Sequence, residues 1–219
     1  MLESFPLPTN SEIESVRREL KPNGLASDIF HTQRSAQNLS WPRIIYLVAR
    51  VPIQQFYWMM RGYRKARIGA KLFAKMYNCV IARLNWNELN RSALKNLTEL
   101  DTRRVVYFPL QQQPEASTLT LAPYATNQVA LLNELALSLP ADVQLVVKEH
   151  IYALHGRPKG FYENIKAIPN VTLMHPAVSS LELIRRADLV CVITSSAGYE
   201  AAVLGKPVVH FGHYSTLFG

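Results

Sequence analysis

Cysteine is scarce in this chain of 219 residues, and no long uninterrupted apolar run is present. The only cysteines, Cys79 and Cys191, lie far apart among apolar residues, which argues against a disulfide framework or a cysteine-rich metal site and favours a reducing, cytoplasmic setting. The most apolar stretch, residues 44–60, is interrupted by Arg50 and Pro52. It is a poor candidate for a transmembrane helix, which needs about 20 mostly apolar residues.

Acidic residues are missing from a wide central stretch, because no Asp or Glu lies between Asp28 and Glu88. The same stretch holds the basic residues Arg34, Arg43, Arg50, Arg61, Arg64, Lys65, Arg67, Lys71, Lys75 and Arg83. Residues 43–83 are therefore expected either to lie on an anionic membrane surface, peripheral on the inner face of the cell membrane, or to form interdomain helices with solvated cations. Nucleic acid is not an expected partner: the sequence pI is near 9.6, but no nucleic-acid-binding motif accompanies it.

Several nucleotide-binding and catalytic motifs are also missing. The sequence contains no Walker-type phosphate loop, no GxGxxG fingerprint, no GxSxG elbow and no HExxH zinc motif. A P-loop nucleotidase, a dehydrogenase of the common type and a serine hydrolase are thereby disfavoured. Neither a metal ion nor a cofactor is expected.

What the sequence does contain falls into three parts. Residues 1–40 are polar, residues 41–103 are basic and helical in pattern, and residues 104–219 alternate short apolar runs with amphipathic helices. The apolar runs are VVYFPL, VQLVVKEH, VTLMHP, LVCVIT and PVVHFG. Continuous apolar strands alternating with helices predict a Rossmann-like, doubly wound parallel α/β sheet.

Polar residues gather in the loops that follow these strands. In a doubly wound sheet, ligands bind beyond the carboxyl ends of the strands, where the loops lead into helices. The loops read QQQPE, KEHIYALHGRPKG, HPAVSS, TSSAGYE and GHYSTLFG in chain order. A functional site is therefore expected at this edge.

The loop TSSAGYE is the first candidate. A helix beginning near Ser196 would offer unpaired N–H groups to a phosphate, Ser195 and Ser196 would add hydroxyls, and Gly198 would allow close approach. Glu200 is out of register for a capping box and is expected to accept hydrogen bonds from a ribose. The structural alternatives are that the serines only cap the helix and that Glu200 only complements its dipole.

Four further residues are candidates in the other loops. Lys148 and His150 lie on one side of a strand end, where a cation and an imidazole could stabilise a departing phosphate. Glu115 follows the first strand and could act as a base, bind a hydroxyl or simply be exposed. His175 ends the third strand, and it is either a nucleotide-sugar ligand or a structural histidine.

The segments VYFPLQQQPE, VVKEH, PNVTLMHP and ITSSAGYEAAVLGKPVVHFG, in this order, resemble the capsule polysaccharide biosynthesis family of bacterial glycosyltransferases. The resemblance covers roughly residues 104–219 and implies the C-terminal half of a GT-B fold. It also implies a donor site bordered by Gln113, Pro114 and Glu115 and by Lys148, Glu149 and His150, with Ser195, Ser196, Gly198 and Glu200 holding the nucleotide. The family's HP motif appears here as His150 followed by Ile151, and the first 100 residues show no second Rossmann pattern. Residues 41–98 are therefore expected to correspond to the helical tail and linker of an acceptor domain, in a fragment or a shortened relative.

These features predict a donor-binding half of a glycosyltransferase. Its catalytic residues would be Glu115 and His150, its donor a nucleotide-sugar, with CMP-Kdo favoured, and its acceptor a lipid-linked sugar or a glycan. Two alternatives stay open from the sequence: a non-catalytic module for membrane-surface binding or assembly, and a nucleotide-sugar epimerase on the same fold.

Overall fold

The computed structural model describes Ser11, Glu14 and residues 40–61 and 67–213 of the chain. The polar segment expected at residues 1–40 lies almost entirely outside the described residues. The helices are α3 (Trp41–Met60), α4 (Arg67–Ser92), α5 (Ala116–Leu121), α6 (Gln128–Ser138), α7 (Phe161–Lys166), α8 (Ser180–Arg186) and α9 (Ala197–Val203). The short 3-10 helices are η1 (Leu97–Glu99), η2 (Pro123–Ala125) and η3 (Ile151–Gly156).

Five parallel strands form one sheet: β1 (Arg104–Pro109), β2 (Val143–Lys148), β3 (Val171–Met174), β4 (Leu189–Val192) and β5 (Val208–His210). Their order across the sheet is β3-β2-β1-β4-β5. The chain moves outward in one direction from β1 to β3, then crosses back to β4 and continues in the other direction. This order confirms the predicted doubly wound parallel sheet and places the topological switch point between β1 and β4.

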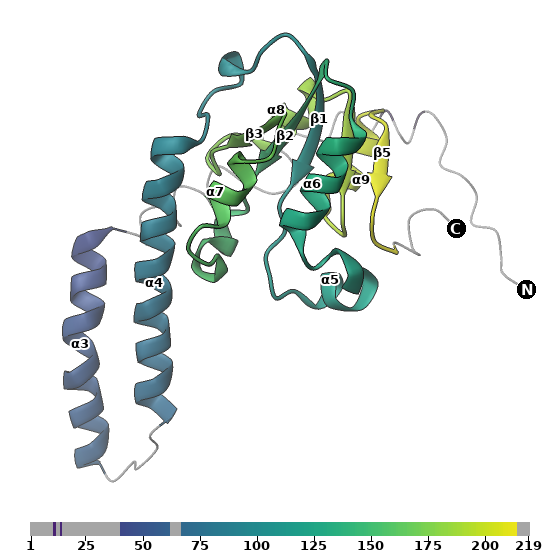
Figure 1. Cartoon of the computed structure of the whole chain (residues 1–219). Helices are drawn as coiled ribbons and strands as arrows, with labels where there is room; N and C mark the ends of the chain where they lie inside the picture. The colour runs from purple at the N-terminus through teal and green to yellow at the C-terminus, as the bar shows by residue number, and fades with distance from the viewer. Residues whose placement is uncertain (1–10, 12–13, 15–39, 62–66, 214–219) are drawn as a thin grey trace, which may run out of the picture.

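Helices cover both faces of the sheet (Figure 1). Side chains alternate along each strand, so Val106 and Phe108 of β1 pack into one core layer while Val105 and Tyr107 pack into the other. The first layer contains buried residues of α4, α6 and α7, and the second contains those of α8 and α9. Leu132 of α6 is fully buried in the first layer.

The sheet unit includes more of the chain than the pattern after residue 104. Ala82 and Leu89 of α4, and Ala93 directly after it, are buried in the first core layer. Asn85 of the same helix donates to the carbonyl oxygens of Leu154 and Arg157 at 2.6 and 3.2 Å. The C-terminal half of α4 therefore packs as one of the helices that cover the sheet. In Figure 1, α3 lies beside the N-terminal half of α4, on the side away from the sheet.

Two six-residue helical elements have no counterpart in the sequence prediction. The loop after β1 contains α5, and the loop after β2 contains η3. Both lie at the carboxyl edge of the sheet, where the sequence predicted loops. They have six residues each, which is too short for a helical period to appear in the pattern.

Candidate functional site

A pocket of about 340 Å³ opens at the carboxyl edge of the sheet. Its lining comes from the ends of β1 and β2, from η3, from the turn into α8 and from the start of α9. Of the predicted site residues, it brings together Lys148, His150, Ser195, Ser196 and Glu200. These residues come from separate crossovers and meet at the topological switch point, as expected for a ligand site of this fold.

The end of β2 directs successive side chains to opposite faces of the sheet, as the strand alternation predicts. The Lys148 ammonium donates to Ser180 Oγ at 2.6 Å, at the first residue of α8. The next residue, Glu149, accepts from Tyr162 of α7, which covers the other face. Lys148 is only 8% exposed, so its positive charge lies at a partly desolvated pocket wall. Cations are worth more to an anionic ligand in such a place than in open water.

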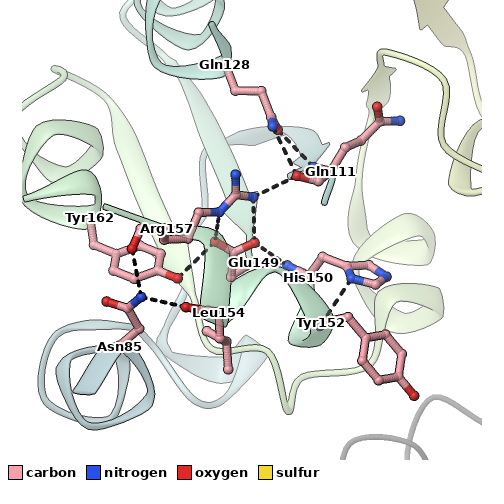
Figure 2. A network of polar contacts seen from close by, with 9 residues as sticks. All are labelled: Asn85, Gln111, Gln128, Glu149, His150, Tyr152, Leu154, Arg157 and Tyr162. Carbon is pink, nitrogen blue, oxygen red and sulfur yellow. Dashed lines mark hydrogen bonds and ion pairs between the residues drawn. The ribbon is translucent and has the colours of Figure 1, made fainter. Parts of the chain in front are cut away.

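Glu149 and Arg157 form a buried ion pair below this wall (Figure 2). Arg157 donates to the two Glu149 carboxylate oxygens at 2.7 and 2.9 Å, and the Tyr162 hydroxyl donates to one of them at 2.9 Å. Burial alone would lower the pKa of Arg157, but the Glu149 carboxylate outweighs it and raises that pKa above its ordinary value. Burial, together with Glu149, raises the pKa of Tyr162 far above its usual range, which keeps the hydroxyl a donor.

His150 follows this pair and is held by its own neighbours. Its backbone N–H donates to Glu149 Oε1 at 2.6 Å, and its ring Nδ1 accepts from the N–H of Tyr152 at 3.3 Å. An accepting Nδ1 leaves the proton of a neutral imidazole on Nε2. The ring of Tyr152 lies 5.6 Å from the His150 ring and also lines the pocket. His150 can therefore act as a hydrogen-bond donor from a fixed position.

The loop between β4 and α9 turns tightly around Ser195. The carbonyl oxygen of Ser195 accepts from the N–H of Gly198 at 3.1 Å, and its hydroxyl accepts from the N–H of Ala197 at 3.2 Å. Ser196, at the cap position of α9, is exposed, and Glu200 follows one turn later. The two serines and the carboxylate thus stand on the same helix start that the sequence analysis singled out.

Gly198 contributes by packing. A Cβ at this position would lie 2.6 Å from the His210 ring and 2.8 Å from Val192 Cγ2, and Gly198 is not among the residues that line the pocket. Its missing side chain lets α9 lie directly on β4 and β5. The expected role of Gly198 in admitting an anion close to the backbone stays a prediction.

Glu115 and His175 are not among the residues that line the pocket. Glu115 is exposed at the start of α5, after a cis peptide bond between Gln113 and Pro114. His175 is buried, its Nδ1 accepts from the N–H of Ala177 at 3.1 Å, and burial lowers its pKa to about 4. Their expected catalytic and ligand roles stay predictions, and the surroundings of His175 are those of a neutral structural histidine.

Other residues at the site were not singled out by the sequence analysis. Ser180 and Tyr152 line the pocket, while Gln111 and Arg157 lie buried below it. Ser180 could have been found as the helix start after the third strand. No sequence pattern indicated a role for Arg157, because its ion pair with Glu149 forms only once the loop after β2 has folded.

A family model described as "Capsule polysaccharide biosynthesis protein" matches residues 45–216, which is well over half of the chain. Among proteins of known role, the chain is similar to the "Capsule polysaccharide modification protein LipA" of Neisseria meningitidis serogroup B, with 29% identity over 82 residues. The same protein from Neisseria meningitidis serogroup A matches with the same identity. Each match covers 37% of this chain and spans only 12% of the length of the relative.

Two solved structures from Thermosulfurimonas dismutans are also similar. The KpsC beta Kdo 2,7 transferase matches with 27% identity and a TM-score of 0.42, over 61% of this chain and 41% of that chain. The KpsC beta Kdo 2,4 transferase matches with 20% identity and a TM-score of 0.45, over 61% and 45% of the two chains. The family-model match includes α4, the whole sheet and every residue of the pocket. This chain therefore belongs to the capsule polysaccharide biosynthesis family.

Proposed function

We propose that this chain is the donor-binding half of a glycosyltransferase of capsular or surface polysaccharide biosynthesis, corresponding to the C-terminal half of a GT-B fold. One observation carries the proposal. Lys148, His150, Ser195, Ser196 and Glu200, from two separate crossovers, line a single pocket at the switch point of the sheet. Membership of the capsule family supports the same assignment.

The chemistry of the pocket fits a nucleotide with a single phosphate. Lys148 and the two serine hydroxyls offer donors to an anion, and Glu200 offers an acceptor to a ribose diol. The other lining carboxylate, Glu149, is neutralised by Arg157. A single lysine balances the one charge of the phosphodiester in a CMP-linked sugar better than the two charges of the diphosphate in a UDP- or GDP-linked sugar. CMP-Kdo is therefore the donor we favour, with a lipid-linked sugar or a glycan as acceptor.

In the proposed reaction, the acceptor hydroxyl oxygen forms a bond to the anomeric carbon, and the bond from that carbon to the phosphate oxygen breaks. The nucleoside phosphate leaves with the electron pair. Lys148 and the Nε2–H of His150 stabilise the charge that develops on it. The acceptor proton passes to a base, for which Glu115 is the candidate in this chain, and an acceptor bound beside α5 would bring the two together.

Calorimetric titration with CMP, UDP and GDP tests the donor site. We expect CMP to bind, and Lys148→Met to weaken it by about tenfold or more, because a hydrogen bond to a charged group contributes roughly 1.5 to 3 kcal/mol. Lys159→Met removes an exposed lysine outside the pocket and is the matched control. Cytidine, which has no phosphate, should bind both variants equally. Binding of none of the three nucleotides, or equal CMP binding by the two variants, would sink the proposal.

A second candidate function, binding to a membrane surface, rests on α3. Among the side chains of α3 that the structure describes, the exposed large apolar ones are Trp41, Ile45, Tyr46, Ile53, Phe56, Tyr57, Met59 and Met60. Within the described part of the chain, no helix combines the length and apolar character needed to cross a membrane. We propose that α3 and the Lys and Arg side chains within residues 43–83 lie on an anionic leaflet. Each cation there contributes about 1 kcal/mol to the free energy of membrane binding.

Sedimentation with vesicles of mixed anionic and neutral phospholipid tests this second candidate. The triple variant Arg64→Ser, Lys65→Ser and Arg67→Ser should lose most of its binding. A matched triple variant, Lys159→Ser, Lys166→Ser and Arg185→Ser, removes the same charge from exposed positions of the sheet unit and should bind normally. Equal loss in both would point to net charge alone, and no loss in either would refute a role for residues 43–83.

A further inference from the structure

Gln111 stands where three loops of the pocket edge meet. It follows β1 by two residues, is only 5% exposed, and contacts the loop after β1, the loop after β2 and the loop after β4. It does not line the pocket itself. Its contacts therefore act on any ligand only through other residues.

The main chain of Gln111 is fixed on one side by Gln128 and Arg157 (Figure 2). Its N–H donates to Gln128 Oε1 at 2.8 Å, and its carbonyl oxygen accepts from Gln128 Nε2 at 3.0 Å and from Arg157 Nη2 at 2.7 Å. Arg157 is held in turn by the carboxylate of Glu149. Glu149, which directly precedes the donor His150, and Arg157, which holds the Gln111 carbonyl oxygen, thus belong to one buried network.

The side chain of Gln111 reaches the other way, toward the loop before α9. Of the two orientations of its amide, only one gives both the oxygen and the nitrogen suitable partners, because two backbone N–H groups face the oxygen position. In that orientation, Nε2 donates to the hydroxyls of Thr118 and Thr194 at 2.6 and 3.0 Å. Oε1 then accepts from the backbone N–H of Ser195 at 2.6 Å and of Thr194 at 2.8 Å. Two consecutive N–H groups of residues 193–196, which join β4 to α9 and are called the serine loop below, are therefore bound by one buried oxygen.

We infer that Gln111 is a positioning residue of the donor site: it sets the place of Ser195 and Ser196 by binding the main chain of the loop that carries them. The inference rests on the proposed function, since it concerns the same pocket. Buried polar groups that are fully satisfied hold one arrangement, because every alternative leaves a donor or acceptor without a partner.

Gln144 provides a matched comparison within the same sheet. It is another buried glutamine, at 4% exposure, and its amide donates to Thr172 of the neighbouring strand. It lies near the amino end of β2, where its register partner is Val105, and does not line the pocket. Loss of its side chain removes a buried amide of the same size without touching the serine loop.

Two measurements test the inference: hydrogen exchange of the Thr194 and Ser195 amides, and CMP affinity by calorimetry. In Gln111→Leu, we expect exchange at these two amides to rise by about tenfold or more relative to the β1 and β2 amides, and CMP affinity to fall by about tenfold. Gln144→Leu should change neither.

Gln111→Glu keeps an oxygen that can accept from both N–H groups, so it should restore slow exchange at Thr194 and Ser195 even though its charge would still weaken binding of an anion. This variant also keeps the test decisive if Gln111→Leu does not fold. Unchanged exchange in Gln111→Leu, or equally fast exchange in Gln111→Glu, would overturn the inference. The exchange arm needs no ligand, so wild-type protein that fails to bind CMP would refute the proposed function and leave the positioning result readable.

Discussion

At the scale of single residues, the strongest constraint lies in the buried charges beneath the pocket. The side chains of Arg157 and Glu149 are 3% and 0% exposed. Among the hydrogen-bond partners that the structure gives these two side chains, each is the only one that carries a charge opposite to the other. A charge removed from water is tolerated only while its partner and its hydrogen bonds are in place. The pair is therefore better explained as fixing the loop after β2 than as a ligand site.

Removing one member of this pair should cost more than removing both. We expect Arg157→Met to lower the free energy of unfolding by about 3 to 5 kcal/mol, because it leaves the Glu149 carboxylate buried without its partner. The double variant Glu149→Gln, Arg157→Met should lose less than this single variant. Urea unfolding of the three proteins measures both values, and a double variant less stable than Arg157→Met would contradict this account.

A second residue makes stability depend on pH. Burial lowers the pKa of His175 to about 4, whereas in the unfolded chain the imidazole takes a proton near its ordinary value of 6.5. Below pH 6.5 the unfolded state therefore binds more protons than the folded state, so stability falls as the pH falls and the loss is complete near pH 4. The difference corresponds to roughly 3 kcal/mol.

The variant His175→Asn isolates this contribution. Its side-chain oxygen can still accept from the N–H of Ala177, but it does not titrate. Burial also lowers the pKa of His210, which is present in both proteins, so only the difference between them reports on His175. Unfolding free energies at pH 7 and pH 4.5 should show a smaller acid loss in the variant, and an identical acid loss would count against a neutral buried His175.

Local signals explain which site residues could be predicted. Lys148, Ser195, Ser196 and Glu200 stand directly at the end of a strand or the start of a helix, so strand periodicity was enough to bring them to one edge. Gln111 could not be predicted in the same way. Its role depends on contacts with Gln128 and Thr194, which are 17 and 83 positions away along the chain.

At the scale of elements, the sequence predicted the five strands and the helices between them, because their apolar positions repeat with the period of each structure. It separated α4 from the sheet unit, because the composition changes at residue 104. In the structure, Leu89 of α4 is fully buried in the core layer beside α6 and α7. Composition could not report this contact, since a basic helix can bury one face while its other faces stay in water.

A pair of leucine variants tests whether α4 folds with the sheet. We expect Leu89→Ala to lower the free energy of unfolding by about 2 to 5 kcal/mol, because it leaves a cavity in the core. Leu84, on the same helix, is 52% exposed, and Leu84→Ala should change stability by no more than about 0.5 kcal/mol. Hydrogen exchange of the β1 amides follows the sheet itself. If Leu89→Ala left that exchange unchanged, α4 would not belong to the same cooperative unit.

At the scale of the whole molecule, the pocket exists only when the sheet is assembled, because its walls come from β1, β2, η3 and the starts of α8 and α9. These segments are joined through parallel pairings between distant parts of the chain, such as Phe108 with Val147 and Tyr107 with Val190. A ligand of this pocket therefore binds the native state and has no comparable site on the unfolded chain. In contrast, α3 contributes no wall of the pocket.

Binding should accordingly stabilise the sheet unit as a whole. At a free CMP concentration one hundred times the Kd, we expect the free energy of unfolding to rise by about 2.7 kcal/mol. The rise should appear as slower exchange in all the central strands and should be absent from α3. At the same CMP concentration, Lys148→Met should show a smaller rise, in proportion to the logarithm of its weaker affinity, while Lys159→Met should match the wild type. Protection confined to η3, with β1 and β4 unchanged, would mean that CMP binds one loop instead of the pocket that the whole sheet builds.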